Sequence, residues 1–243
     1  MLLWLSALPP YVSLVVALVA ANVVALAVTF TARYWARTRN VTAGPAVVNC
    51  WAISTGGLSA LLFAFAIVTL WNMMSAAQAA AGAESTSIRL VARDLASDQV
   101  PLLRSYVTES IDEWPRLCGG KPDPRVDATL TMLERVARPR AAEYADDLFR
   151  QLAAMENLRY NRWQQSGASA PFELEIALGI ITIALLGVLG IALPERADTH
   201  AALTVLVACA FGVVFWVVST LAYSYCGNHN VGPELMSAAL REL

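Results

Sequence analysis

The sequence predicts an all-α membrane protein that has four transmembrane helices, with a helical extramembrane domain between the second and third spans. Of its 243 residues, 57% are hydrophobic and only 15% are charged, against roughly a quarter charged in an average soluble domain. The apolar residues gather in four blocks of about 20 residues, the length that a helix needs to cross the hydrocarbon core of a bilayer. A central stretch of ordinary soluble composition separates the second block from the third.

Each of the four blocks can form one membrane-spanning helix. They cover approximately residues 11–31, 47–71, 176–193 and 200–223, and none of them contains Asp, Glu, Lys or Arg. Aromatic residues such as Tyr11, Trp71 and Tyr223 stand at their ends, where amphipathic rings settle at the level of the headgroups. Neither Lys nor Arg precedes the first block, although a signal peptide requires a positive start. We therefore expect this block to be a retained span.

The central segment, residues 84–170, carries 12 Lys and Arg against 13 Asp and Glu. Its apolar residues recur at three- and four-residue steps, which is the pattern of amphipathic helices. The stretch from Trp71 to Leu95 is rich in Ala and contains no Pro, so we expect the second span to continue as one long helix. The chain is thus expected to divide into residues 1–83 with two spans, 84–170 as the helical domain, and 171–243 with two spans and a short tail.

The loop after the first span predicts how the chain is oriented. It contains Arg33, Arg37 and Arg39 and no acidic residue, and short loops rich in Arg stay on the cytoplasmic side. With four spans, both termini and the central domain are then expected outside the plasma membrane.

Polar residues near or within the spans are candidates for a pore. Glu173 and Glu175 stand at the start of the third span. They either favour the helix N-terminus electrostatically or form a ring of carboxylates at a pore mouth. Asn49, Gly56 and Ser59 fall on one side of the second span, where they either line a pore or let another helix pack closely.

The composition of the chain argues against several classes of function. A net charge of −2 is not that of a basic nucleic-acid binder. The two His and four Cys are scattered, so we expect no metal site. The sequence has no phosphate-binding loop or catalytic motif, so we expect no cofactor and no enzyme activity.

Cys118 and Cys226 are the cysteines outside the spans. Both are expected on the oxidising side, where a disulfide between them would persist.

Several short strings resemble those of a bacterial membrane-protein family labelled bestrophin-like. The strings are Glu84, then Arg104 with Tyr106 and Val107, then Glu113-Trp114-Pro115, Arg159 and Arg162, and Gly232-Pro233 in the tail. The resemblance implies a distant similarity to pentameric anion channels. Within it, Arg104, Arg159 and Arg162 are expected to pair with Glu84 and Glu113 where the domain meets the membrane, a structural role that we rank above ligand binding.

Two functional hypotheses follow. The first is a homo-oligomeric channel for small ions, because a four-helix protomer is too small to enclose a wide pore alone. The alternative is a non-catalytic membrane subunit that docks a partner protein through residues 84–170. The partners expected are therefore the lipid bilayer, further copies of the chain, and in the second case another protein.

Overall fold

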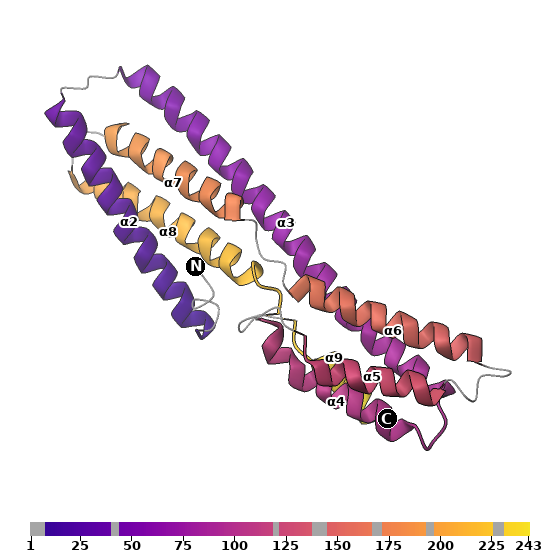
Figure 1. Cartoon of the computed structure of the whole chain (residues 1–243). Helices are drawn as coiled ribbons and strands as arrows, with labels where there is room; N and C mark the ends of the chain where they lie inside the picture. The colour runs from indigo at the N-terminus through magenta and orange to yellow at the C-terminus, as the bar shows by residue number, and fades with distance from the viewer. Residues whose placement is uncertain are drawn as a thin grey trace. The chain divides into compact units, whose positions relative to one another are not determined.

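The computed structural model describes residues 8–39, 44–118, 122–137, 145–166, 172–192, 197–225 and 231–243. Within these ranges the chain forms eight α-helices and no β-strand (Figure 1). The chain divides into two compact units. The membrane unit comprises Met1–Trp71 and Ala170–Ala222, and the extramembrane unit comprises Asn72–Ser169 and Tyr223–Leu243.

Four helices are long and apolar enough to cross a membrane. They are α2 (Pro10–Thr38), α3 (Pro45–Asp94), α7 (Phe172–Ala192) and α8 (Ala197–Leu221), and each contains most or all of one predicted span. In the membrane unit α2 lies against both α7 and α8 (Figure 1). The expectation of four membrane-spanning helices is therefore confirmed.

Two glycines allow the helices of the membrane unit to approach closely. A Cβ atom at Gly190 of α7 would lie 2.7 Å from the carbonyl oxygen of Thr29, and one at Gly212 of α8 would lie 3.2 Å from the Cβ of Ala21. In lipid the hydrophobic effect does not drive helices together, and association depends on van der Waals packing. Small residues favour this packing because they let the backbones approach closely. Phe63 of α3 contacts the rings of Phe211 and Phe215, each with its centroid 5.4 Å away.

The helix α3 is a single helix of 50 residues, as the Pro-free stretch from Trp71 to Leu95 predicts. One face of it is buried from Ser59 onward. This stripe comprises Ser59, Phe63, Ala66, Leu70, Ala77, Ala81, Glu84, Ile88 and Val91, which recur at three- and four-residue steps, with one step of seven residues from Leu70 to Ala77, and so lie on one helix face. The first part of α3 thus contributes to the core of the membrane unit, and the last part to that of the extramembrane unit.

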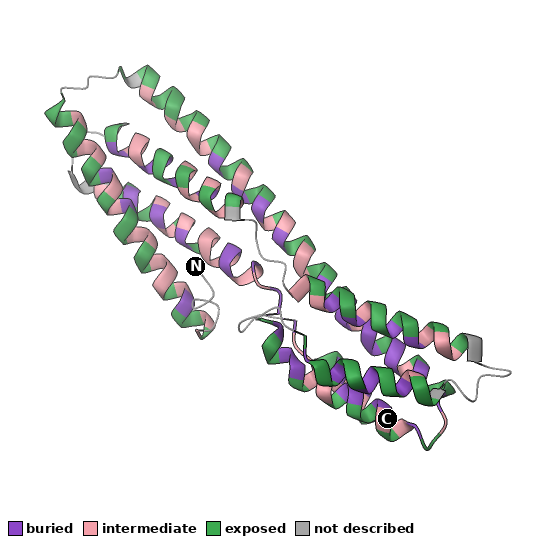
Figure 2. Ribbon diagram, in the orientation of Figure 1, coloured by how far each residue is buried: buried purple, intermediate pink, exposed green. Residues whose placement is uncertain are grey.

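The extramembrane unit surrounds the end of α3 with four further helices. These are α4 (Val100–Leu117), α5 (Pro124–Ala137), α6 (Ala145–Ser166) and α9 (Glu234–Glu242). Their inner faces form one apolar core that includes Leu103, Val107, Leu133, Leu152 and Met236, all with no exposed surface (Figure 2). The predicted amphipathic helices of the central segment are therefore present, and the C-terminal tail adds the helix α9 to the same core.

Candidate functional site

The site is built around an ion pair between Glu84 of α3 and Arg162 of α6. The Arg162 Nε lies 2.6 Å from Glu84 Oε2, and the Nη2 lies 3.3 Å from Glu84 Oε1. The side chains are 1% and 0% exposed. This two-pronged geometry is the strongest that a guanidinium and a carboxylate adopt. Since either charge alone would be costly to bury, the pair fixes α6 against α3.

Glu113 of α4 connects this pair to a second arginine. It accepts hydrogen bonds from Arg159 Nη2 at 3.0 Å and from Arg162 Nη2 at 3.4 Å. It also accepts one from the backbone N–H of Asp123 at 2.6 Å. Arg159 extends the network to Asp127 of α5. Two buried carboxylates and two guanidinium groups, from α3, α4 and α6, therefore balance one another. We refer to Glu84, Glu113, Arg159 and Arg162 as the ion-pair cluster.

Aromatic side chains cover the ion-pair cluster. The Tyr106 hydroxyl donates to Glu84 Oε1 at 2.9 Å, and the Arg162 Cζ lies 4.6 Å from the centroid of the Trp114 ring. Burial, and then the charge of Glu84, raise the pKa of Tyr106 well above its ordinary value. Tyr106 thus stays protonated and serves as a hydrogen-bond donor. Burial lowers the pKa of Arg162, but the negative charges of Glu84 and Glu113 outweigh it, so the net pKa is raised.

The C-terminal segment completes this site. The Trp114 Nε1 donates to the carbonyl oxygen of Val231 at 2.7 Å, and the Tyr225 hydroxyl donates to the carbonyl oxygen of Ala77 at 3.0 Å. Ser85 donates to the carbonyl oxygen of Leu235 at 2.9 Å. The residues after the fourth span are thus held against α3 and α4 by hydrogen bonds as well as by the apolar core.

The structure brings together four of the five residues that the sequence analysis grouped as ion pairs. Arg104 lies on the exposed face of α4, outside the ion-pair cluster. Asp123 is not among the residues predicted from the sequence. It accepts a hydrogen bond from the backbone N–H of Arg125 at 3.0 Å and forms ion pairs with Arg116 and Arg125. Its position directly before Pro124, at the start of α5, is the signal of a helix N-cap that could have identified it.

The candidate pore residues of α3 do not share one environment. Asn49 is exposed. A Cβ atom at Gly56 would lie 4.0 Å from Leu185 of α7. Ser59 is buried, and its hydroxyl donates to the carbonyl oxygen of Thr55 at 2.7 Å. Gly56 therefore lies beside α7, and Ser59 is hydrogen-bonded within α3, while a pore-lining role for either residue stays a prediction. Glu173 and Glu175 lie in the first turn of α7, where Glu173 is exposed and Glu175 half-buried.

Among the cysteines, Cys50 and Cys209 have free thiols. The Sγ of Cys118 lies 3.9 Å from the carbonyl oxygen of Tyr225, the residue before Cys226. Cys226 itself lies outside the residues that the structure describes, so its bridge to Cys118 stays a prediction.

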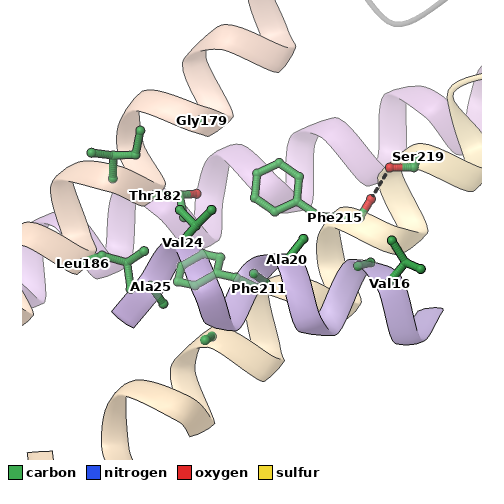
Figure 3. A pocket seen from close by; sticks show the side chains of 14 residues that line it. Val16, Ala20, Val24, Ala25, Gly179, Thr182, Leu186, Phe211, Phe215 and Ser219 are labelled. Atoms are coloured by element: carbon green, nitrogen blue, oxygen red, sulfur yellow. Dashed lines mark hydrogen bonds between the residues drawn. The ribbon is translucent and has the colours of Figure 1, made fainter. Parts of the chain in front are cut away.

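A cavity of about 360 Å³ lies in the membrane unit between α2, α7 and α8. Figure 3 shows its lining, which includes Ala20, Val24, Leu186, Phe211 and Phe215. Its polar side chains, Thr182 and Ser219, donate to helix carbonyl oxygens of their own turns at 2.7 Å. The cavity is therefore apolar. In the described part of the chain, no group of three or more His, Cys, Asp or Glu is placed to hold a metal ion.

Comparison with known proteins agrees with this architecture. The chain is similar to a variant of a bacterial bestrophin homologue from Klebsiella pneumoniae, with 12% identity, a TM-score of 0.68, and coverage of 94% of this chain and 96% of the other. A crystal structure described only as a membrane protein gives 11% identity, a TM-score of 0.67 and the same coverage. No curated protein matches. The Bestrophin-like domain matches residues 18–236, and the chain therefore belongs to the bestrophin-like family.

Proposed function

We propose that this protein is an ion channel formed by several copies of the chain, in the plasma membrane of a bacterium. The family membership and the similarity to solved bestrophin homologues support this function. The four spans lack acidic and basic residues in their apolar blocks, which argues against a proton pump or an ion-coupled transporter, because those proteins carry ionisable groups in the membrane. The alternative of a partner-docking subunit is not favoured by the family.

The observation that carries the proposal is the uncovered face of α3. Opposite its buried stripe, Leu58, Leu61, Phe65 and Val68 follow one another at three- and four-residue steps, and Leu61 and Phe65 are 67% and 63% exposed. A ring of such apolar side chains suits a hydrophobic constriction in an ion path, which gates by dewetting. Copies of α3 placed around an axis would supply that ring.

The experiment is ion flux into liposomes that contain the purified protein. We expect flux above that of empty liposomes, and a higher flux from Phe65→Ala because the constriction widens. Leu206→Ala is the matched control, since Leu206 of α8 is an exposed apolar residue of the membrane unit outside the proposed pore. Flux equal to empty liposomes, or equal effects of the two substitutions, would contradict the proposal.

We further propose that both termini and the extramembrane unit face the outside. The support is the acid-free run of Arg33, Arg37 and Arg39 after α2, which the positive-inside rule assigns to the cytoplasm.

A further inference from the structure

A groove runs along α2 and α7 on the surface of the membrane unit. It has a volume of about 460 Å³ and is lined by Ala27, Val28, Thr31, Ala32 and Trp35 of α2 with Ile183 and Gly187 of α7. We call this the α2–α7 groove. Nearly all of its side chains are apolar. A Cβ atom at Gly187 would meet no atom within 4 Å, so the missing side chain of this glycine leaves room in the groove.

The dimensions of the groove fit one hydrocarbon chain. Ala27 and Trp35 are eight residues apart on a helix, which corresponds to about 12 Å at 1.5 Å per residue. This is most of one leaflet, since the whole hydrocarbon core measures about 30 Å. A hollow lined by apolar side chains does not hold water well, because water needs two or more polar partners. In a bilayer, the abundant apolar species is the acyl chain of a lipid.

One end of the groove is positively charged. Trp35, an aromatic residue of the kind found at the headgroup level, closes it, and Arg39 follows four residues later, one turn further along the same helix face. Arg33 and Arg37 lie two residues on either side of Trp35 and so point to the other side of α2. Within the described residues, none of these three arginines forms an ion pair with a carboxylate. Arg39 is therefore available to an external anion.

We propose that the α2–α7 groove binds an anionic phospholipid, with an acyl chain along the groove and the phosphate at Arg39. Basic residues at the membrane boundary beside a gap between helices are a recognised way to bind acidic headgroups. The three arginines together make the local electrostatic potential more positive, and Arg39 determines where the phosphate binds. The proposal does not depend on ion conduction, so it can fail or hold separately from the channel function.

The test measures lipids retained by the full chain in mild detergent, using native mass spectrometry. Phosphatidylglycerol and phosphatidylethanolamine with identical acyl chains are supplied in equal amounts. We expect preferential retention of phosphatidylglycerol. Arg39→Gln should lower its affinity about fivefold, the effect of one cationic side chain near an acidic surface, and Arg39→Lys should retain most of it. Arg33→Gln removes the same charge on the opposite face and should have a clearly smaller effect.

A second pair of variants tests the acyl chain. Gly187→Leu fills the groove and should lower retention of both lipids, whereas Gly179→Leu on the same helix should not, because Gly179 lines the internal cavity instead. Equal losses from Arg33→Gln and Arg39→Gln would show only a diffuse lipid atmosphere and overturn the proposal. Full retention in Gly187→Leu would also overturn it. If Gly187→Leu left lipid binding unchanged but abolished the oligomer, a second copy of the chain would occupy the groove, and this result would also overturn the proposal.

Discussion

Arg162 and Glu84 are 78 positions apart in the chain, yet the Arg162 Nε lies 2.6 Å from Glu84 Oε2 in the interior of the extramembrane unit. Arg162 is also in contact with Glu113 and with the face of Trp114. Arg162 therefore contacts side chains from both α3 and α4 and joins them to its own helix, α6.

Removal of one partner from this ion pair should destabilise the extramembrane unit strongly. We expect Glu84→Gln or Arg162→Gln to lower the free energy of unfolding by about 3–5 kcal/mol, because the remaining charge is left buried without its partner. Denaturant unfolding followed by tryptophan fluorescence measures this. Arg150→Gln is the control. Its pair with Asp147 has side chains 74% and 76% exposed, and such pairs contribute less than about 1 kcal/mol. Equal effects at the two sites would contradict the prediction.

Asp123 should make the extramembrane unit sensitive to acid. Hydrogen bonds from the side chain and then the backbone of Arg125 lower the pKa of Asp123 from its ordinary 3.8 to about 2. A carboxylate with a lowered pKa stabilises the fold above its ordinary pKa and loses that effect as the pH falls through the lowered value. We expect the difference in stability between the wild type and Asp123→Asn to shrink between about pH 4 and pH 2. A difference that is constant over this range would exclude Asp123 as the titrating group.

Two glycine positions should respond differently to the same substitution. Gly190→Ala places a methyl group against the carbonyl oxygen of Thr29, and overpacking of this kind costs about 1–3 kcal/mol. Gly179→Ala meets no atom within 4 Å and should be tolerated. The melting temperature in detergent and the elution profile of the two variants provide the comparison. An equally stable Gly190→Ala would mean that α2 and α7 separate without penalty.

A disulfide between Cys118 and Cys226 is the fourth prediction. It would close a loop of more than a hundred residues, to which the chain-entropy model assigns about 4–5 kcal/mol as an upper guide. The membrane spans already restrict the unfolded chain, so we expect a smaller effect. Peptide mapping without reduction should find both residues in one linked peptide, while Cys50 and Cys209, which have free thiols, react with a thiol reagent. Labelling of all four cysteines would rule the bridge out.

The proposed orientation can be tested with single cysteines in a background that lacks the native ones. Ala154 of α6 and Thr38 at the end of α2 are both exposed. A membrane-impermeant thiol reagent applied to intact cells should label Ala154→Cys and leave Thr38→Cys unlabelled. The reverse pattern would place the extramembrane unit in the cytoplasm, and Arg33, Arg37 and Arg39 outside.

Much of this fold can be read from local sequence patterns. The four charge-free blocks indicate the spans because the apolar length of a helix is matched to the bilayer. The periodicity of Leu103, Tyr106 and Val107 likewise indicates an amphipathic α4 with one buried face. These signals need no knowledge of distant contacts.

The details of the site are less accessible to such patterns. The family strings group Arg104 with Arg159 and Arg162, yet the helical phase of α4 turns Arg104 outward while Glu113 turns inward. The hydrogen bond between Trp114 and the carbonyl oxygen of Val231 involves a backbone group 117 positions away. Every residue has such a carbonyl group, so the residue type does not show which one accepts the bond. Asp127 contacts Arg159 only because α5 and α6 pack together.

The charge balance of the ion-pair cluster has a consequence for how the extramembrane unit opens. Glu84, Glu113, Arg159 and Arg162 come from α3, α4 and α6, and detachment of any one helix strands an opposite charge in an apolar interior. Partial opening is therefore penalised nearly as heavily as complete opening, which makes these three helices one cooperative unit. Amide hydrogens around all four residues should exchange with solvent through a common opening reaction, with the same free energy of opening. Those at the helix ends should exchange sooner.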